Sequence, residues 1–282
     1  MFQTDLLKGK RILVTGGGTG LGQSMARRYL ELGAEVAICG RRVDVLEKTA
    51  QEFRDAIPGA AVETYGCDVR VPSAVEEMLD RIWEKRSLDI LVNNAAGQIL
   101  AQTHRMSHRA VDSVLNIVLH GSAYCTFGAG RRWIEAGERN KVVMSILTLS
   151  ALQGTAFTVP SAMAKAGVLA MTKSLAVEWG PKGIRTCAIV PGPFPTEGAW
   201  SRLRPQGAGR TPAEAAIPLG RVGEHIELAN LAAYLVSDQA GYINGEHVVI
   251  DGGRQYMSGG GSNTGEMLHW TDAQWDAIRP KK

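Results

Sequence analysis

Several features that would place this chain in a special class of protein are scarce or missing. Only 6% of its 282 residues are aromatic, and the formal net charge is just +3. A small charge spread along the sequence excludes nucleic acid and anionic membrane as bulk partners. Cys39, Cys67, Cys125 and Cys187 lie far apart without ligand spacing, which indicates neither a zinc site nor a disulfide framework. We expect buried free thiols and no metal.

Long hydrophobic runs are also missing. No stretch reaches membrane-spanning length, and the opening residues MFQTDLLKGK hold neither an apolar signal core nor an Arg-rich leader. We therefore expect a soluble cytoplasmic protein that has no membrane partner. The length suits one α/β domain better than two independent halves.

Seven short apolar runs alternate with amphipathic segments. Continuous apolar character predicts strands that are covered on both faces, and hence a parallel sheet between two layers of helices. The fold expected for residues 1–253 is therefore α/β, a doubly wound seven-stranded parallel sheet (Rossmann fold). The strands expected are RILVT, AEVAIC, AVETYGC, LDILVNN, KVVMSI, IRTCAIV and HVVI.

Two segments lack this alternation. Residues 192–223 are rich in Pro, Gly and Arg, which is typical of a substrate lid. The tail, residues 254–282, begins with a flexible glycine-rich stretch and ends in WTDAQWDAI. There we expect Thr271 to cap a short helix.

A glycine-rich turn, GGGTGLG, stands between the first predicted strand and a helical segment. Glycines in this place let the backbone approach a pyrophosphate, whose charge is met by free N–H groups and by the helix dipole. A tight turn without a ligand is the alternative, but the strand and helix on either side favour a dinucleotide. The contacts expected in this turn are Gly16, Gly18, Thr19, Gly20 and Leu21.

The end of the second predicted strand indicates which dinucleotide is bound. Cys39 stands where enzymes that bind a ribose diol usually offer an acid, and Arg41 and Arg42 follow. Guanidinium groups bind phosphate through a fixed fork of donors, so the pair favours NADPH over NADH. A solvated basic turn is the alternative. Asp68, after the third strand, is a candidate contact for the adenine amino group or a helix cap.

The phrases TGGGTGLG, CDV, NNAAG, PSAMAKAG and PGPF occur in this order at predicted strand ends. By these phrases the whole chain resembles the short-chain dehydrogenases and reductases. Most members carry a Tyr four residues before a Lys on one helix; here Lys165 is present and Ser161 holds the place of the Tyr. The usual active-site Ser is matched by Thr148, and the usual Asn of the preceding helix by Val118. The ordinary carbonyl-reducing tetrad is therefore broken.

One branch of that family is more similar. Mitochondrial-type 2,4-dienoyl-CoA reductases share the phrases GGGTGLG, CDVR, NNAAG and SLA-x-EWG, the tail phrase T-x-x-QWD-x-I, and the Ser in place of the Tyr. The resemblance implies an NADPH-dependent reductase of a conjugated acyl-CoA thioester in fatty-acid or related acyl-CoA degradation, with Arg70, Ser107 and Ser161 on the substrate. Besides the glycine-rich turn, the cofactor contacts expected are Arg41, Arg42, Asp68, Val69, Asn94, Lys165, Pro191, Gly192 and Phe194.

The same resemblance implies a homotetramer. In the family, the long helices corresponding to residues 110–137 and 162–180 pack against partner copies. Both segments are apolar on one face in this sequence.

Two positions depart from that branch. It places a catalytic Tyr where this chain has Ser150, and an Asn where it has Gln98. The peroxisomal 2,4-dienoyl-CoA reductases also lack that Tyr and show a TEG phrase like residues 196–198, so its loss does not exclude the activity. Ser150 is a poor acid without a partner, and a serine in such a place often only caps a turn.

The mechanism implied is hydride transfer to the far carbon of the conjugated thioester, with negative charge developing on the thioester oxygen. Ser161 and Gln98 are candidate donors to that oxygen. Lys165 would orient the ribose and, as a cation, stabilise the enolate or lower the pKa of a bound water. His120, four residues beyond Asn116, is a candidate proton relay, although the sequence favours a surface or interface histidine.

Three functions are compatible with the sequence. They are a reductase of conjugated acyl-CoA thioesters, a short-chain oxidoreductase that acts on another carbonyl or ring substrate, and a catalytically impaired NADPH-binding protein. Arg70, Ser107, Ser161 and Lys165 persist in their motif context, which favours an enzyme. The fold alone does not decide between them, because one fold hosts many chemistries.

Overall fold

The computed structural model describes residues 3–196, 216–257 and 267–278. Within these residues, seven parallel strands form one sheet in the order β3-β2-β1-β4-β5-β6-β7. The predicted doubly wound parallel sheet is confirmed. The strands are β1 (Arg11–Thr15), β2 (Glu35–Gly40), β3 (Val62–Gly66), β4 (Ile90–Asn93), β5 (Lys141–Ile146), β6 (Ile184–Pro191) and β7 (His247–Ile250).

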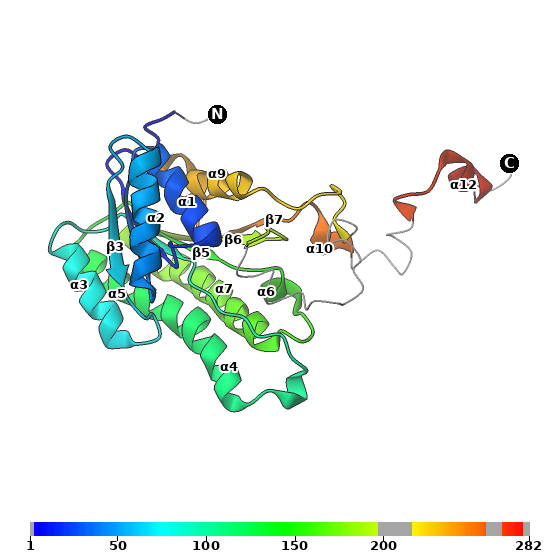
Figure 1. Cartoon of the computed structure of the whole chain (residues 1–282), viewed down its shortest axis with the longest axis horizontal. Coiled ribbons are helices and arrows are strands. Elements are labelled where there is room, and N and C mark those ends of the chain that lie inside the picture. Colours follow the sequence, from blue (N-terminus) through cyan, green and yellow to red (C-terminus); the bar gives the residue numbers. More distant parts are fainter. Residues whose placement is uncertain (1–2, 197–215, 258–266, 279–282) are drawn as a thin grey trace.

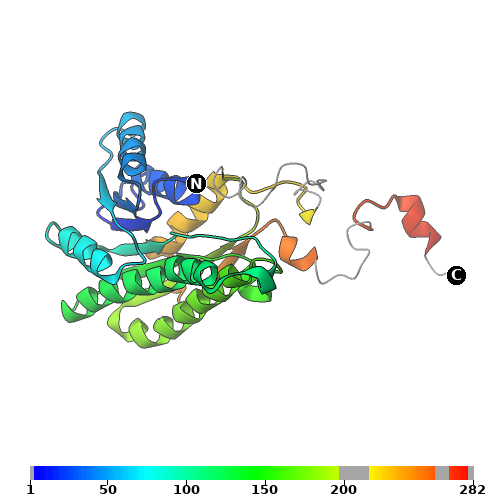
Figure 2. The same cartoon turned by 60° about the horizontal axis from the view of Figure 1, so that its bottom comes forward.

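Helices cover both faces of this sheet (Figures 1 and 2). One layer holds α1 (Gly20–Glu31), α2 (Val43–Ala56) and α9 (His225–Val236). The opposite layer holds α3 (Pro72–Trp83), α4 (His108–Leu115), α5 (Gly121–Glu135) and α7 (Val159–Trp179). Shorter elements are α6 (Ser150–Gln153), α10 (Arg254–Met257), α12 (Asp272–Ala277) and the 3-10 turns Thr103–Arg105, Gly180–Lys182 and Asp238–Ala240.

Each face of the sheet has its own apolar core. On β1, Ile12 and Val14 pack into the core beneath α1, α2 and α9, whereas Leu13 packs into the core beneath α3, α5 and α7. All three side chains are fully buried. Because successive side chains of a strand point to opposite faces, a strand that is covered on both sides needs apolar residues at every position. This is why the runs are continuous in the sequence.

The helix expected over residues 110–137 is interrupted. It begins two residues earlier, at His108, and between α4 and α5 lies a π-helical segment, η2 (Asn116–His120). Such segments are rare and often mark functional sites. A Cβ on Gly121 would lie 2.7 Å from a methyl group of Val69, so the helix passes very close to the turn that follows β3. No periodicity in the sequence signals this change of pitch.

Two local predictions are confirmed. All four cysteines, which lie within the described ranges, are free and buried. Thr271 caps α12, because its hydroxyl accepts from the backbone N–H of Gln274 and the Gln274 side chain reaches back to the Thr271 N–H. The middle of the predicted lid, residues 197–215, lies outside the described residues. Among the described helices, none is long and apolar enough to cross a bilayer.

Candidate active site

The strand order reverses between β1 and β4, and this reversal opens a crevice at the carboxyl edge of the sheet. The segments that follow β1, β2, β3 and β4 line a cavity of about 180 Å³ there. Of the predicted cofactor contacts, those on its wall are Gly16, Gly18, Thr19, Arg41, Arg42, Asp68 and Val69. The sequence reasoning missed Gly40, Val45, Leu46, Ala95, Ala96 and Ile117, and gave Cys39 and Cys67 no role as wall residues.

Two glycines of the glycine-rich turn have no room for a side chain. A Cβ on Gly22 would lie 2.4 Å from the carbonyl oxygen of Gly16, and one on Gly17 would lie 2.5 Å from Ile38. Asn94 holds the turn from below, because its Nδ2 donates to the carbonyls of Thr15 and Gly16 at 2.9 and 3.2 Å. With α1 beginning at Gly20, inside this turn, the cradle of N–H groups fits a dinucleotide pyrophosphate.

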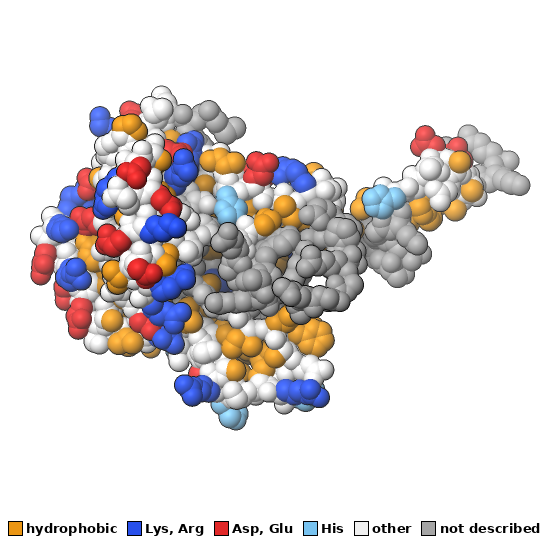
Figure 3. Space-filling view, in the orientation of Figure 1, with side chains coloured by type: hydrophobic (Ala, Val, Ile, Leu, Met, Phe, Trp, Pro, Cys, Tyr) orange, Lys and Arg blue, Asp and Glu red, His pale blue; other side chains and the backbone are white. Residues whose placement is uncertain are grey.

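A basic rim stands beside this cradle. Arg41 and Arg42 are exposed where α2 begins, and Figure 3 shows basic side chains gathered at that end of the helix. Cys39, in the strand β2, is fully buried on the sheet face that packs against α3, α5 and α7, and burial raises the pKa of its thiol well above the usual value. The strand end therefore offers the crevice no negative charge, whereas two guanidinium groups offer positive charge.

Asp68 and Arg70, which follow β3, form one ion-paired unit. Nε and Nη2 of Arg70 donate to the carboxylate of Asp68 at 2.9 and 2.5 Å, and the Arg70 backbone N–H donates to Oδ1 at 3.1 Å. These hydrogen bonds, and the nearby charge of Arg41, lower the pKa of Asp68. Of these two residues, Asp68 lines the cavity and Arg70 does not. Arg70 thus lies at the rim with its guanidinium group held in a fixed direction.

Lys165 is the central charged group of the predicted catalytic set. Its side chain is 5% exposed, and its Nζ donates to the carbonyl of Ile146, the last residue of β5. Burial lowers the pKa of Lys165 to about 8, because a low-dielectric surrounding disfavours the charged form. Two residues beyond β5, the hydroxyl of Thr148 is hydrogen-bonded to that of Ser150. The structure therefore brings Lys165 and Thr148 to the end of the same strand.

The remaining predicted catalytic and substrate residues differ in their surroundings. Ser161 is buried one helical turn before Lys165. Gln98 is exposed in the segment that follows β4. Ser107 caps α4 by accepting from the backbone N–H of Ala110 at 3.2 Å, a role the sequence did not indicate, which leaves its proton free to donate.

His120 and Asn116 do meet. Nδ1 of His120 lies 2.8 Å from Oδ1 of Asn116, as their spacing predicts. The His120 side chain is exposed, however, and its ring centroid lies 6.0 Å from that of Tyr124. This environment agrees with a surface or interface histidine.

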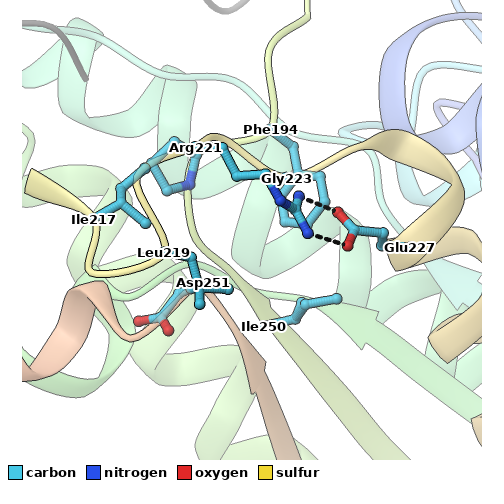
Figure 4. Close-up of a pocket in the computed structure, with 10 residues that line it drawn as sticks. Phe194, Ile217, Leu219, Arg221, Gly223, Glu227, Ile250 and Asp251 are labelled. Carbon is cyan, nitrogen blue, oxygen red and sulfur yellow. Dashed lines mark hydrogen bonds and ion pairs between the residues drawn. The ribbon is translucent and has the colours of Figure 1, made fainter. Parts of the chain in front are cut away.

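The segment after β6 closes the other end of the crevice. Pro191 is the last residue of the strand, and a Cβ on Gly192 would lie 2.7 Å from Asp251. The ring of Phe194 is 7% exposed and packs in the core, so its side chain is occupied with packing. It lines a second cavity, of about 70 Å³, whose mouth is framed by the Arg221–Glu227 ion pair (Figure 4).

Two of the cavity-wall residues that the sequence reasoning missed did have a signal in the sequence. Ala95 and Ala96 belong to the phrase NNAAG directly after β4, and small residues at that point leave room for a ligand. Ile117 had none, because it reaches the cavity from the π-helical segment. Side chains that arrive from the helix layer depend on helix pitch, which spacing along the sequence does not give.

Comparison with known proteins agrees with this fold. A family described as enoyl-(acyl carrier protein) reductase matches residues 16–255. An uncharacterised oxidoreductase of Caenorhabditis elegans is 46% identical, with 96% of this chain and 87% of that protein covered. Two proteins named as probable 2,4-dienoyl-CoA reductases follow: one of C. elegans, 42% identical over 99% and 91% of the two chains, and one of Bacillus subtilis, 38% identical over 87% and 96%.

Solved structures give the same result. A short-chain dehydrogenase from Bacillus anthracis is 41% identical with a TM-score of 0.77, covering 87% of this chain and 96% of that one. A short-chain dehydrogenase/reductase from Mycobacterium marinum is 31% identical with a TM-score of 0.79, covering 88% and 96%. The chain belongs to the short-chain dehydrogenase/reductase family of oxidoreductases. This fold implies a nicotinamide cofactor.

The buried state of Lys165 makes stability depend on pH. Its pKa is about 8 in the folded protein and 10.5 without burial, so the unfolded chain binds more protons between these values and stability rises with pH across that window. We expect Lys165→Met to remove this rise. Relative to the variant, the unmutated protein should gain on the order of 1–3 kcal/mol in free energy of unfolding between about pH 7 and about pH 10.

Urea denaturation at the two pH values measures this difference. Lys173→Met, which replaces an exposed lysine of the same helix, is the matched control and should leave the pH dependence as it is. A Lys165→Met curve that runs parallel to that of the unmutated protein would show that the amine is not penalised by burial.

Proposed function

We propose that this protein is an NADPH-dependent reductase of conjugated acyl-CoA thioesters, similar to the 2,4-dienoyl-CoA reductases. The observation that carries the proposal is the buried Ser161 four residues before the buried Lys165. A carbonyl reductase of this family needs an acidic hydroxyl at that position to protonate the alkoxide. A conjugated thioester needs only a hydrogen bond to its oxygen there, because the proton goes to carbon.

NADPH is the cofactor we propose, because of the groups that line the crevice. The backbone cradle at Gly16 to Gly22 fits a pyrophosphate, and the exposed Arg41 and Arg42 lie where a 2′-phosphate on the adenosine ribose would need a partner. The buried Cys39 offers no carboxylate to repel that phosphate. Asp68 lines the cavity wall and is the acceptor that we propose for the adenine amino group.

The cofactor, when bound, supplies a hydride. Addition of that hydride to C5 of a 2,4-dienoyl thioester gives a dienolate whose charge lies on the thioester oxygen. Ser161 donates a hydrogen bond to that oxygen in the proposed mechanism, and Gln98 becomes a second donor if its segment closes over the substrate. Lys165 holds the nicotinamide-side ribose and keeps positive charge close to the dienolate.

The carbon atom that receives the proton then decides which product forms. Protonation of the dienolate at C2 gives a (3E)-enoyl thioester, and protonation at C4 gives a (2E)-enoyl thioester. The names of the relatives include both outcomes, (3E) for two probable 2,4-dienoyl-CoA reductases of C. elegans and (2E) for the one of B. subtilis. We propose the (3E) product, in line with the more similar relatives, and water as the proton source, because Ser150 stands where the acid would be.

The CoA moiety would meet the rim of the crevice. Arg70 is held at this rim by Asp68, and its guanidinium group is a suitable partner for a CoA phosphate or thioester. Ser107, at the start of α4, keeps a hydroxyl proton for the same ligand.

We also propose a homotetramer, since α5 and α7 carry large apolar side chains on their solvent side. Phe127 is 51% exposed and Val177 is 80% exposed, and a second copy would cover such side chains. Light scattering should give four times the chain mass of 30.3 kDa. Val177→Asp should lower that mass, whereas Glu178→Gln, at the next residue, should not. A monomer for the unmutated protein would exclude the proposal.

Cofactor preference is the first test of the proposed function. NADPH should bind at least about tenfold more tightly than NADH, because two guanidinium groups meet the 2′-phosphate. Arg41→Ala should erase the preference by weakening NADPH alone. Lys48→Ala removes an exposed charge from the same helix α2 and should leave the ratio unchanged. Fluorescence titration measures both dissociation constants, and equal values in the unmutated protein would contradict the assignment.

Catalysis is the second test. Oxidation of NADPH should be seen with 2,4-dienoyl-CoA and not with simple ketones. Lys165→Ala should nearly abolish it, whereas Ser150→Ala should cost little, because water delivers the proton. A general acid typically contributes about 10²–10⁴-fold, so Ser150→Tyr should raise turnover if the local geometry accepts the ring.

Two outcomes would overturn this mechanism. If Ser150→Ala is as damaging as Lys165→Ala, then Ser150 is itself the acid or its anchor. If NADPH binds well and no conjugated thioester is reduced, the function lies with another substrate class or with cofactor binding alone.

A further inference from the structure

His225, the first residue of α9, joins two walls of the crevice that are far apart in sequence. Its Nε2 lies 2.7 Å from the carbonyl oxygen of Pro195, in the segment after β6. Its Nδ1 lies 2.8 Å from the hydroxyl oxygen of Ser24, in the first turns of α1. The ring is half-buried between the two. The helix that begins at the glycine-rich turn is thereby tied to the segment at the far end of the crevice.

The partners of the ring fix where its proton lies. A carbonyl only accepts hydrogen bonds, so Nε2 carries the hydrogen and donates to Pro195. In the neutral ring Nδ1 is then an acceptor for the Ser24 hydroxyl. The hydroxyl has one proton, so while it donates to Nδ1 it does not donate to the carbonyl of Gly20, which lies 3.0 Å away. The connection from Pro195 thus runs through His225 to Ser24, four residues after the start of α1.

The start of α9 is a rigid base for this ring. Arg221 pairs with both carboxylate oxygens of Glu227 at 2.8 and 2.7 Å, as Figure 4 shows. Glu227 also accepts from the backbone N–H of Glu224 at 2.8 Å, in a capping box. The Arg221 guanidinium and this backbone N–H lower the pKa of Glu227 to about 2. His225 follows the cap directly, so its backbone has little freedom.

The segment that accepts the hydrogen bond from His225 is held at other points as well. The carbonyl of Pro193 accepts from the backbone N–H of Gly223 at 3.0 Å. A Cβ on Gly223 would lie 2.4 Å from the ring of Phe194. Further along, a Cβ on Gly20 would lie 3.2 Å from Cγ2 of Thr196. Between these points, the His225 side chain supplies the cross-link from Pro195 to α1.

We propose that His225 is a positioning residue for the nicotinamide half of the cofactor. It sets the spacing between the glycine-rich turn with α1 and the segment after β6, the two walls between which the pyrophosphate and the nicotinamide riboside would bind. The adenosine half would bind elsewhere, in the cavity lined by the segments after β1 to β4. The proposal rests on the nicotinamide cofactor of the proposed function and on neither the substrate nor the 2′-phosphate preference.

Calorimetric titration with two ligands tests whether His225 acts on the nicotinamide half of the cofactor and not on the adenosine half. NADPH spans both halves of the site, whereas 2′,5′-ADP occupies only the adenosine half. His225→Ala should weaken NADPH roughly tenfold, since a hydrogen-bonded link is lost, and should leave 2′,5′-ADP unchanged. His225→Gln, which keeps an N–H donor for Pro195, should recover part of the loss. Hydrogen exchange of a peptide that spans residues 192–196 should speed up in His225→Ala without any ligand.

The controls separate positioning from general damage to the helix. Ser24→Ala cuts only the α1 end of the link and should give a smaller effect of the same pattern, and the double variant should be no worse than His225→Ala. Ile226→Ala changes an exposed neighbour on the same helix and should change neither ligand. Equal weakening of NADPH and 2′,5′-ADP, or no weakening of either by His225→Ala or Ser24→Ala, would overturn the proposal. Repeating the titrations with NADH and 5′-AMP shows the same pattern if only the NADPH preference is wrong.

Discussion

The burial of every inner strand on both faces is the constraint on which the rest of this structure depends. A strand covered by helices on each side satisfies its backbone within the sheet and leaves no face for a ligand. Chemistry is confined to the carboxyl edge, where the chain must leave the sheet, and above all to the reversal of strand order between β1 and β4. The glycine-rich turn, the basic rim, Asp68 and Lys165 all lie at this edge for that reason.

The same burial gives the edge its electrostatic character. Lys165 reaches the end of β5 through a surrounding that has little water, so its amine is poised between its charged and neutral forms. The guanidinium groups of Arg41 and Arg70, by contrast, stand at exposed rims, where they can attract phosphates and exchange water for ligand. A buried amine at the centre and arginines at the margins suit the proposed reaction, in which charge develops on one oxygen of the substrate.

The fold was predictable because its signal is local and repeated: each strand is a short apolar run followed by an amphipathic helix. The residues of the glycine-rich turn and the basic rim were predictable for the same reason, since they stand directly after strand ends. Ile117 and the π-helical segment were not, because a local change of helix pitch, here beside the close approach of Gly121 to Val69, leaves no pattern in the sequence. His225 was not, because its two partners lie 30 and 201 residues away. Such contacts exist only once α1, β6 and α9 have been brought together.

The four cysteine thiols of the folded chain are buried and therefore poorly reactive. Cys39, Cys67 and Cys125 lie in the core under α3, α5 and α7, and Cys187 lies in the core under α1 and α9. Burial raises the pKa of every one of these thiols, so almost no thiolate exists at neutral pH to react with an alkylating reagent. Cys125 and Cys187 do not line the cavity at the carboxyl edge, so each becomes reactive only when the helix layer above it opens. Alkylation of Cys187 against that of Cys125 therefore reports the opening of one helix layer separately from the other.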